Sequence, residues 1–295
     1  MAKTGDGESL GTAEGAVMGR AAHALHAEDP VLDDHWAIHL LGEASRAQVT
    51  SPDYLALSIE RAGFDASRIL AIGVGALRYA EDEVERCVAR GVGQYVILGA
   101  GFDTFALRRA DLVDRLVVFE VDHPDVQALK RSRIEAAAET PASLPRFVPV
   151  DFETTTLEAG LSAAGFDPDR EAIFSFMNTT PYLTEEAIEA TLSEIARLAA
   201  PGSRIVLNYG AEVPLSAEQV EYLETLQSNV RASGEPWRSR FRPEAFEALL
   251  ERVGFVLIEH ATEADLFERY FAGRRDGFRP GVPGRLVTAE VAPRG

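Results

Sequence analysis

The sequence predicts an α/β fold in which a mostly parallel sheet is covered by helices on both faces. Two observations predict it. From residue 91 onward, short apolar runs alternate with segments of helical periodicity, the order that builds parallel sheets. The first run, Tyr95–Leu98, has the pattern of a fully buried strand and breaks directly into Gly99-Ala100-Gly101. Glycines at this place let the backbone turn tightly and approach a ligand without a Cβ in the way.

The composition limits the kinds of protein and binding partner that the chain can represent. The chain has 295 residues, of which 46% are hydrophobic and 26% charged, so we expect a globular fold with an ample core. Its 29 basic and 47 acidic residues give a formal charge of −18, which disfavours nucleic acid and anionic membranes as partners. Cys87 is the only cysteine, which excludes an intrachain disulfide and a cysteine zinc site. The sequence shows no membrane-spanning stretch and no signal-peptide pattern, so a cytoplasmic location is expected.

A helical cap is expected before the sheet. Residues 1–15 are rich in Gly, Ser and Thr and predict a tail. From Ala16 to Ile72 the chain is Ala-rich and helical in texture, and a helix from Leu77 to Arg90 follows it. We therefore divide the chain into a tail with a helical cap, residues 1–90, and a sheet domain, residues 91–295.

The sheet domain is expected to contain seven strands with helices between them. The strands are predicted at Tyr95–Leu98, Leu116–Glu120, Arg146–Val150, Ala172–Phe176, Arg204–Tyr209, Phe255–His260 and Arg285–Val291. The helices are predicted at Thr104–Ala110, Pro124–Glu139, Leu157–Ala164, Thr184–Leu198 and Pro243–Val253. Residues 211–242 break this rhythm with a polar, helix-like stretch from Ser216 to Asn229. An insertion beside the carboxyl ends of the strands is placed to act as a lid.

Acidic residues follow successive strands where a nucleoside would need them. Glu120 and Asp122 end the second strand, where a carboxylate commonly accepts hydrogen bonds from ribose hydroxyls. After the third strand, Asp151 offers an acceptor for an adenine amino group, and Phe152 offers an aromatic ring. Each acid alone is more simply a helix cap or a solvated loop residue, but several in register after successive strands favour a site.

The glycine turn lacks the third glycine of a dinucleotide-binding motif. Thr104 occupies that position, and Asp103 stands where a pyrophosphate would approach. A carboxylate there repels pyrophosphate but suits a ligand with a cationic amino-acid head, as in S-adenosylmethionine. A nicotinamide oxidoreductase is therefore disfavoured.

Motifs along nearly the whole chain, in family order, resemble the leucine-carboxyl-methyltransferase-like S-adenosylmethionine-dependent methyltransferases, especially the bacterial branch that includes polyketide O-methyltransferases. The matching segments are Val31–Ala37, Arg78–Gln94, Leu98–Thr104, Phe119–Pro124, Val150–Asp151, Tyr182–Thr184 and Tyr270–Gly277. The resemblance implies a Rossmann-like class I methyltransferase fold, with a seven-stranded sheet whose last strand is antiparallel and a helical cap over the pocket.

The resemblance also implies the cofactor-binding residues. Arg78 should pair with the carboxylate of S-adenosylmethionine, and Gly99 should lie beneath the cofactor. Asp122 should hold the ribose, and Asp151 with Phe152 should take the adenine. The predicted cofactor set is completed by Ala100, Gly101, Asp103, Glu120, His123, which follows Asp122 and could orient it, and Met177.

Three positions depart from the family pattern. Ala76 fills the place of a second arginine, and Phe105 stands where many relatives have arginine. Met177-Asn178 replaces an acid-glycine pair that often follows the fourth strand. These departures concern the identity of the substrate more than the binding of the cofactor.

Four residues are candidates for a catalytic role: His23, His26, Asn178 and Tyr182. The two histidines lie in the cap and could reach a substrate as a base, although a structural role is the simpler interpretation. His35 and His39 have a spacing that suits metal ligands on a helix, but no further motif accompanies them. We predict no metal site.

The predicted activity is O-methylation of a small molecule, such as a polyketide-type metabolite, by in-line displacement at the sulfonium methyl. Alignment of the reacting atoms is then the enzyme's main task. A carboxylate acceptor is already ionised near neutral pH, whereas a hydroxyl would need a base. The absence of a base motif favours the carboxylate. The alternatives are a non-catalytic regulatory binder of the same fold and a methyltransferase for protein C-terminal carboxyl groups. The sequence leaves the oligomeric state open.

Overall fold

The computed structural model describes residues 12–151, 155–232, 234 and 236–294. In this part of the chain seven strands form one sheet in the order β3-β2-β1-β4-β5-β7-β6. All neighbouring pairs are parallel except those of β7, which runs antiparallel to both β5 and β6. The strands are β1 (Gln94–Leu98), β2 (Val117–Asp122), β3 (Arg146–Pro149), β4 (Ile173–Phe176), β5 (Arg204–Gly210), β6 (Phe255–Thr262) and β7 (Gly284–Val291).

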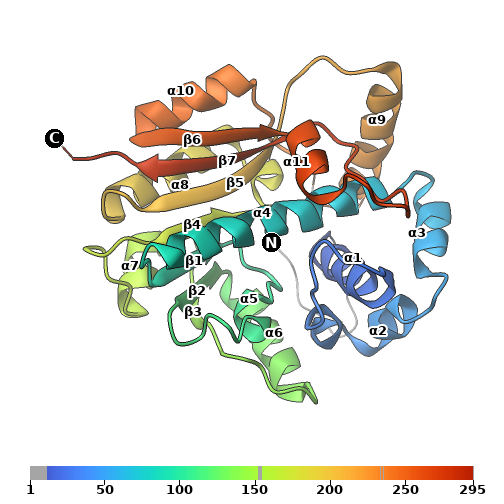
Figure 1. The fold of residues 1–295 in the computed structure, drawn as a ribbon, viewed down its shortest axis with the longest axis horizontal. Coiled ribbons are helices and arrows are strands. Elements are labelled where there is room, and N and C mark those ends of the chain that lie inside the picture. Colours follow the sequence, from blue (N-terminus) through green and yellow to red (C-terminus); the bar gives the residue numbers. More distant parts are fainter. Residues whose placement is uncertain (1–11, 152–154, 233, 235, 295) are drawn as a thin grey trace.

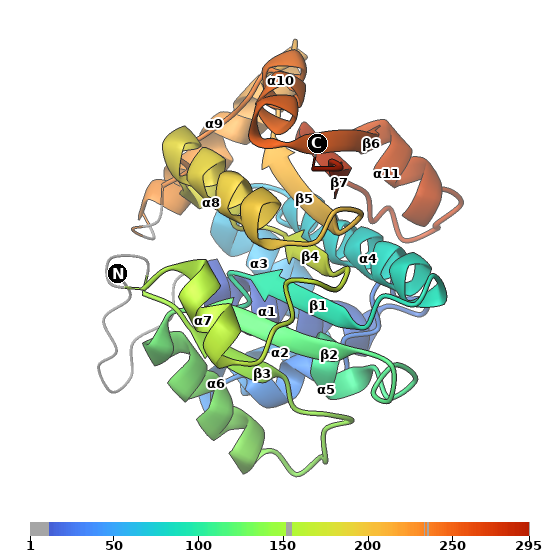
Figure 2. The same ribbon diagram turned by 90° about the vertical axis from the view of Figure 1, so that its left-hand side faces the viewer.

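Helices cover both faces of the sheet and bury an apolar cluster on each (Figure 2). The helices α4 and α5 lie on one face, where α6 also packs through the contact of Lys130 with Glu120, and α7, α8 and α10 lie on the other. Their bounds are α4 (Ser67–Ala89), α5 (Phe105–Arg108), α6 (Pro124–Ala136), α7 (Leu157–Ala163), α8 (Glu185–Leu198) and α10 (Pro243–Val253). Because β1 and β4 are neighbours, the chain reverses its direction across the sheet between them, and such a switch point is where α/β folds bind ligands.

The remaining helices gather at the end of the molecule toward which β6 points, which is the carboxyl edge of the parallel strands (Figure 1). They are α1 (Thr12–His26), η1 (Ala37–Leu40), α2 (Glu43–Val49), α3 (Tyr54–Ala62), α9 (Ala217–Ala232) and α11 (Glu263–Tyr270). The cap has its own apolar core, in which Trp36 and Leu40 pack with Phe102 from the glycine turn. The cap therefore rests directly on the turn that follows β1.

The predicted strands and the class I methyltransferase fold are confirmed, and the antiparallel last strand is present. The helix predicted from Leu77 begins at Ser67 instead. Two glycines, which weaken helix propensity, obscured this first half. A Cβ on Gly75 would lie 3.1 Å from Leu266, so close packing against α11 explains that glycine.

Three further details differ from the predictions. The tail prediction is wrong for residues 12–15, which are helical, and residues 1–11 lie outside the described part. The helix predicted at Thr104–Ala110 is a single turn, α5. The sequence reading missed α11, which begins at a capping box formed by Thr262 and Asp265. The division into domains at residue 90 stays a prediction.

Candidate functional site

The turn after β1 places two glycines in the left-handed region, with φ 62° at Gly99 and φ 50° at Gly101. Their surroundings differ. A Cβ on Gly99 would lie 2.7 Å from Thr179 Oγ1, so this glycine makes room for the segment after β4. A Cβ on Gly101 would meet nothing within 4 Å. The open side of the turn, where a ligand could approach the backbone, is therefore at Gly101.

Asp122 ends β2 beside this open side. Its Oδ2 accepts a hydrogen bond from the Gly101 amide at 2.6 Å, and its Oδ1 accepts one from the His123 amide at 2.7 Å. Burial raises the pKa of Asp122, and these two amides oppose that shift. A carboxylate has about four lone-pair positions, so this one retains capacity for two hydroxyl donors. The open turn at Gly101 and the carboxylate of Asp122 together fit the ribose of a nucleoside cofactor.

His123 orients Asp122 through its backbone only. Its imidazole Nδ1 accepts from the Asp125 amide at 3.3 Å and caps α6. Asp103 is likewise a local cap, because its Oδ1 accepts from the Phe105 amide at 2.7 Å where α5 begins. Ala100 donates its amide to the Val121 carbonyl and holds the turn against β2.

Glu120 faces α6 from the interior of the sheet. One carboxylate oxygen lies 2.5 Å from Lys130 Nζ, and both side chains are almost fully buried. The other oxygen, Oε1, is buried without a hydrogen-bond partner among the described residues. Burial raises the pKa of Glu120 to about 7, against the attraction of Lys130 and with the repulsion of Asp103. Glu120 is thus buried within the fold and interacts electrostatically with Asp103 and Asp122.

Arg78 lies on α4 and pairs with Asp82, with 2.6 Å between Nη2 and Oδ1. Asp82 also accepts from the Tyr270 hydroxyl at 2.7 Å, which ties α4 to the end of α11. The guanidinium is about one-third exposed, at 36%. Arg78 is therefore held by a carboxylate of its own helix, and a cofactor carboxylate would compete with Asp82 for it.

Asn178, directly after β4, has φ 57° and is the single non-glycine residue with positive φ in the described part of the chain. Its amide nitrogens and oxygen are all engaged: the backbone N–H donates to Asn208 Oδ1 at 2.6 Å, Nδ2 donates to the Gly73 carbonyl at 3.2 Å, and Oδ1 accepts from Asn208 Nδ2 at 3.0 Å. The strained residue locks the ends of β4 and β5 to α4. Buried Met177 precedes it, and its carbonyl accepts from Thr179 Oγ1 at 3.0 Å.

The predicted adenine site is described in part. Asp151 follows β3, is half-buried, and accepts the Thr155 amide at its carbonyl at 2.7 Å. Phe152 lies outside the described residues.

The two cap histidines are both committed to structural hydrogen bonds. His23 is buried, its Nε2 accepts from the Val31 amide at 3.0 Å, and its ring stacks on Phe278 at 4.6 Å. Burial, reinforced by Arg274, lowers the pKa of His23 to about 4. His26 Nε2 lies 2.8 Å from the Val49 carbonyl. Tyr182 packs in the apolar cluster under α9.

His35 and His39 share a carboxylate partner, Glu139. Their Nε2 atoms lie 3.5 Å and 2.9 Å from Glu139. The stretch predicted as helix around them is only the short turn η1. The described residues contain no group of three or more His, Cys, Asp or Glu side chains placed to hold a metal ion.

Sequence reasoning missed a buried charge network that joins the cap to the glycine turn. Asp34 is fully buried and accepts from Arg20 Nη1 at 2.8 Å and from Thr104 Oγ1 at 2.5 Å. Arg20 Nη2 also donates to the Phe102 carbonyl at 2.7 Å. Arg108 lies 3.7 Å from Asp34 and pairs with buried Glu81 on α4. Asp34 and Thr104 lie in the quoted family motifs, but nothing in the sequence shows that they touch.

Comparisons with known proteins agree with this geometry. The sequence model of the family described as leucine carboxyl methyltransferase matches residues 13–196. The chain belongs to this family of S-adenosylmethionine-dependent methyltransferases. The predicted family, enzyme class and cofactor are thereby confirmed at the level of the family.

Among similar proteins, a Bacillus subtilis relative named "Putative S-adenosyl-L-methionine-dependent methyltransferase YktD" is 36% identical over 199 residues, which are 67% of this chain and 65% of that protein. The chain thus matches just under two thirds of that relative's length. A similarly named Mycobacteroides abscessus protein is 32% identical over 236 residues, covering 76% of this chain and 73% of the relative.

Two solved structures share the fold over almost their whole length. One, from Thermobifida fusca and described as that of "a putative methyltransferase", superposes with a TM-score of 0.57 at 19% identity and covers 93% of this chain and 94% of that one. A Streptomyces avermitilis protein of the DUF574 family gives 0.56 at 18% identity, covering 93% and 97%. At this identity the likeness concerns the fold alone. No helix within the described residues is long and apolar enough to cross a membrane.

Proposed function

We propose that this protein transfers a methyl group from S-adenosylmethionine to a carboxylate oxygen of a small molecule, of the kind found among polyketide-type metabolites. Bound S-adenosylmethionine supplies an electrophilic methyl group on a sulfonium sulfur. The protein's task is then to bind the donor at the turn after β1 and to align an acceptor oxygen beside it.

The donor site is supported by the geometry around Gly101. Asp122 would accept hydrogen bonds from the ribose hydroxyls, and the open backbone at Gly101 would lie against the ligand. Asp151 would stand at the adenine. Arg78 would bind the carboxylate of the donor in exchange for Asp82. Glu120 would act indirectly, because its buried pair with Lys130 fixes the strand that carries Asp122.

One observation carries the choice of acceptor: the buried cap histidine, His23, cannot serve as a general base as it stands. The Nε2 lone pair of His23 is used by the Val31 amide, whereas His26 is exposed and donates its Nε2–H to the Val49 carbonyl. A phenol, with a pKa of about 10, needs a base near neutral pH, whereas a carboxylate, with a pKa of about 4, does not. The engagement of the buried histidine of the cap supports a carboxylate acceptor.

The proposal is tested by the pH dependence of methyl transfer. Purified protein with labelled S-adenosylmethionine is assayed against panels of small carboxylic acids, phenols and peptides with free or amidated C-termini. A carboxylate acceptor should give a kcat/KM that is flat between pH 6 and 8, since it is fully ionised there. A rising limb on phenols would make the acceptor a hydroxyl. Transfer to free C-terminal peptides alone would make it a protein carboxyl methyltransferase. Binding of the donor without any transfer would indicate a regulatory binder.

Donor binding has its own test. Replacing Asp122 by alanine should weaken binding of S-adenosylmethionine more than tenfold in calorimetry, since each lost bond to a charged group is worth about 1.5–3 kcal/mol. Asp125→Ala, three residues on at the exposed start of α6, is the matched control and should bind normally. Equal affinity of the Asp122 variant and the control would remove Asp122 from the site.

A further inference from the structure

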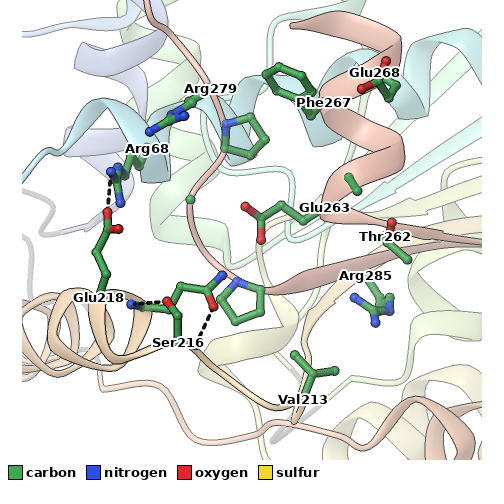
Figure 3. A pocket seen from close by; sticks show the side chains of 15 residues that line it. Arg68, Val213, Ser216, Glu218, Thr262, Glu263, Phe267, Glu268, Arg279 and Arg285 are labelled. Carbon is green, nitrogen blue, oxygen red and sulfur yellow. Dashed lines mark hydrogen bonds and ion pairs between the residues drawn. The ribbon is translucent and has the colours of Figure 1, made fainter. Parts of the chain in front are cut away.

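A cavity of about 670 Å³ lies outside the site described above, between the start of α9, α11 and the loop before β7 (Figure 3). We call it the α9–α11 pocket. Its volume falls within the range of about 300–1,000 Å³ that is typical of small-molecule sites. None of the predicted cofactor-binding residues lines it. It is therefore a separate candidate for ligand binding.

The pocket lies at the same edge of the sheet as the glycine turn. Its walls come from segments far apart in sequence, among them Arg68 at the start of α4, Glu263 at the start of α11 and Arg285 in β7. Because β7 runs antiparallel, its first residues meet the last residues of β5 and β6 here. One and a half turns along α4 from Arg68, the Gly73 carbonyl accepts from Asn178. The first turns of α4 thus separate the pocket from the end of β4.

The pocket contains arginine and glutamate side chains, and some of them lack ion-pair partners among the described residues. Arg68 is paired with Glu218 at 2.9 Å. Arg279 and Arg285 make no ion pair with the described residues, and the one hydrogen bond that Arg285 makes is to the Gly284 carbonyl at 3.0 Å. The carboxylate of Glu263 accepts no hydrogen bond from the described residues. Figure 3 shows it directed toward the middle of the pocket.

Glu263 is the second residue of the capped turn that starts α11, a position where a helix favours an acid. The helix end does not account for its surroundings, however. The carboxylate is half-buried, and this burial raises the pKa of Glu263 despite the attraction of Arg285 and Arg68. A cationic partner or a strong donor would recover part of this cost. Phe267, one turn further along α11, and Pro280 add apolar surface.

We propose that the α9–α11 pocket binds a zwitterionic small molecule with an apolar body, as in an apolar α-amino acid. A simple anion would be repelled by Glu263, and a simple cation by the two arginines without ion-pair partners. A zwitterion satisfies both requirements: its ammonium group donates to Glu263, its carboxylate binds Arg285, and its side chain packs on Phe267. This second site does not depend on the proposed methyl acceptor.

The test uses the full chain and three matched probes: L-phenylalanine, 3-phenylpropanoate, which lacks the ammonium, and 2-phenylethylamine, which lacks the carboxylate. Binding is followed by titration calorimetry, with amide chemical shifts of α11 locating the site. L-Phenylalanine should bind saturably, and each analogue should bind at least tenfold more weakly. Leucine and methionine extend the panel to other apolar side chains.

Variants assign the two ends of the ligand. E263Q keeps the size of the side chain and should weaken L-phenylalanine at least tenfold, and R285Q should do the same. E268Q removes an exposed carboxylate of the same helix and lining, and should bind normally. Affinity for S-adenosylmethionine, measured in each variant, should be unchanged and reports folding and the donor site separately. The proposal is overturned if no amino acid of the panel binds, if an analogue binds as tightly as L-phenylalanine, or if E263Q binds like E268Q.

Discussion

Two regions cover the carboxyl edge of the sheet, and they are held in place by different kinds of interaction. The cap, represented by α1 and the segment up to η1, is tied to the glycine turn by buried charges, with Asp34 between Arg20 and Thr104. The helix α9 is held by an apolar cluster instead. It buries Tyr222, Leu223, Leu226 and Val230 against the loop between α3 and α4, the start of α4 and the segment after β4.

This difference in the type of contact predicts different roles for the two regions: the cap positions the glycine turn, and α9 covers the edge of the sheet. Buried charged hydrogen bonds are directional and costly to break singly, so they fix the cap and the glycine turn in one arrangement. Apolar contacts are non-directional and scale with buried area, so α9 can open and repack at a smaller cost. We expect the cap to behave as part of the donor site and α9 as an adjustable lid.

The largest effect is expected from Asp34→Ala. The substitution leaves Arg20 and Thr104 without their shared acceptor in a fully buried place. Removing one partner of a buried ion pair costs about 3–5 kcal/mol, so the midpoint of urea unfolding should fall strongly. Asp33→Ala, at the exposed neighbouring position, should change stability by less than about 0.5 kcal/mol. Equal midpoints for the two variants would show that the network does not hold the cap.

A smaller effect is expected from pH, through His23. Its pKa is lowered to about 4 in the folded cap, from about 6.5 when exposed. The unfolded chain therefore binds a proton first as pH falls, and stability present above pH 6.5 is lost down to pH 4. This difference between the folded and unfolded pKa of His23 corresponds to about 3 kcal/mol in the free energy of unfolding.

His23→Gln keeps an acceptor for the Val31 amide and does not titrate, so it should flatten the fall in stability over this window. His26→Gln, on an exposed side chain three residues later, should leave the slope as in the wild type. A wild-type slope in the His23 variant would assign the acid sensitivity to another group.

The smallest effect on the whole fold is expected from Leu226→Ala in α9. Truncating a buried leucine costs about 2–5 kcal/mol, and a peripheral helix that can collapse onto the gap lies near the lower limit. Hydrogen exchange should rise across α9 while α1 stays protected. Val220→Ala, at an exposed position of α9, is the control. Loss of protection in α1 as well would show that lid and cap open as one unit.

The layout of the sheet, the turn after β1 and the family could all be predicted from the amino-acid sequence. Those features depend on short-range patterns: apolar runs, glycines where φ is positive, and acids at strand ends. The sequence also placed Asp122 at the end of the second strand, whereas the contact of Asp122 with Gly101 depends on the pairing of β1 with β2.

Contacts between side chains that are far apart in the sequence could not be predicted in this way. Asp34 and Thr104 are 70 residues apart in the chain, and their contact depends on how the cap settles on the turn. The same holds for His23, whose Nε2 accepts a hydrogen bond from the Val31 amide in the folded cap. The α9–α11 pocket needs Arg68, Glu263 and Arg285 from three separate elements. Such long-range contacts carry no local signal, because they are selected by packing of the whole chain and not by the propensity of any one segment.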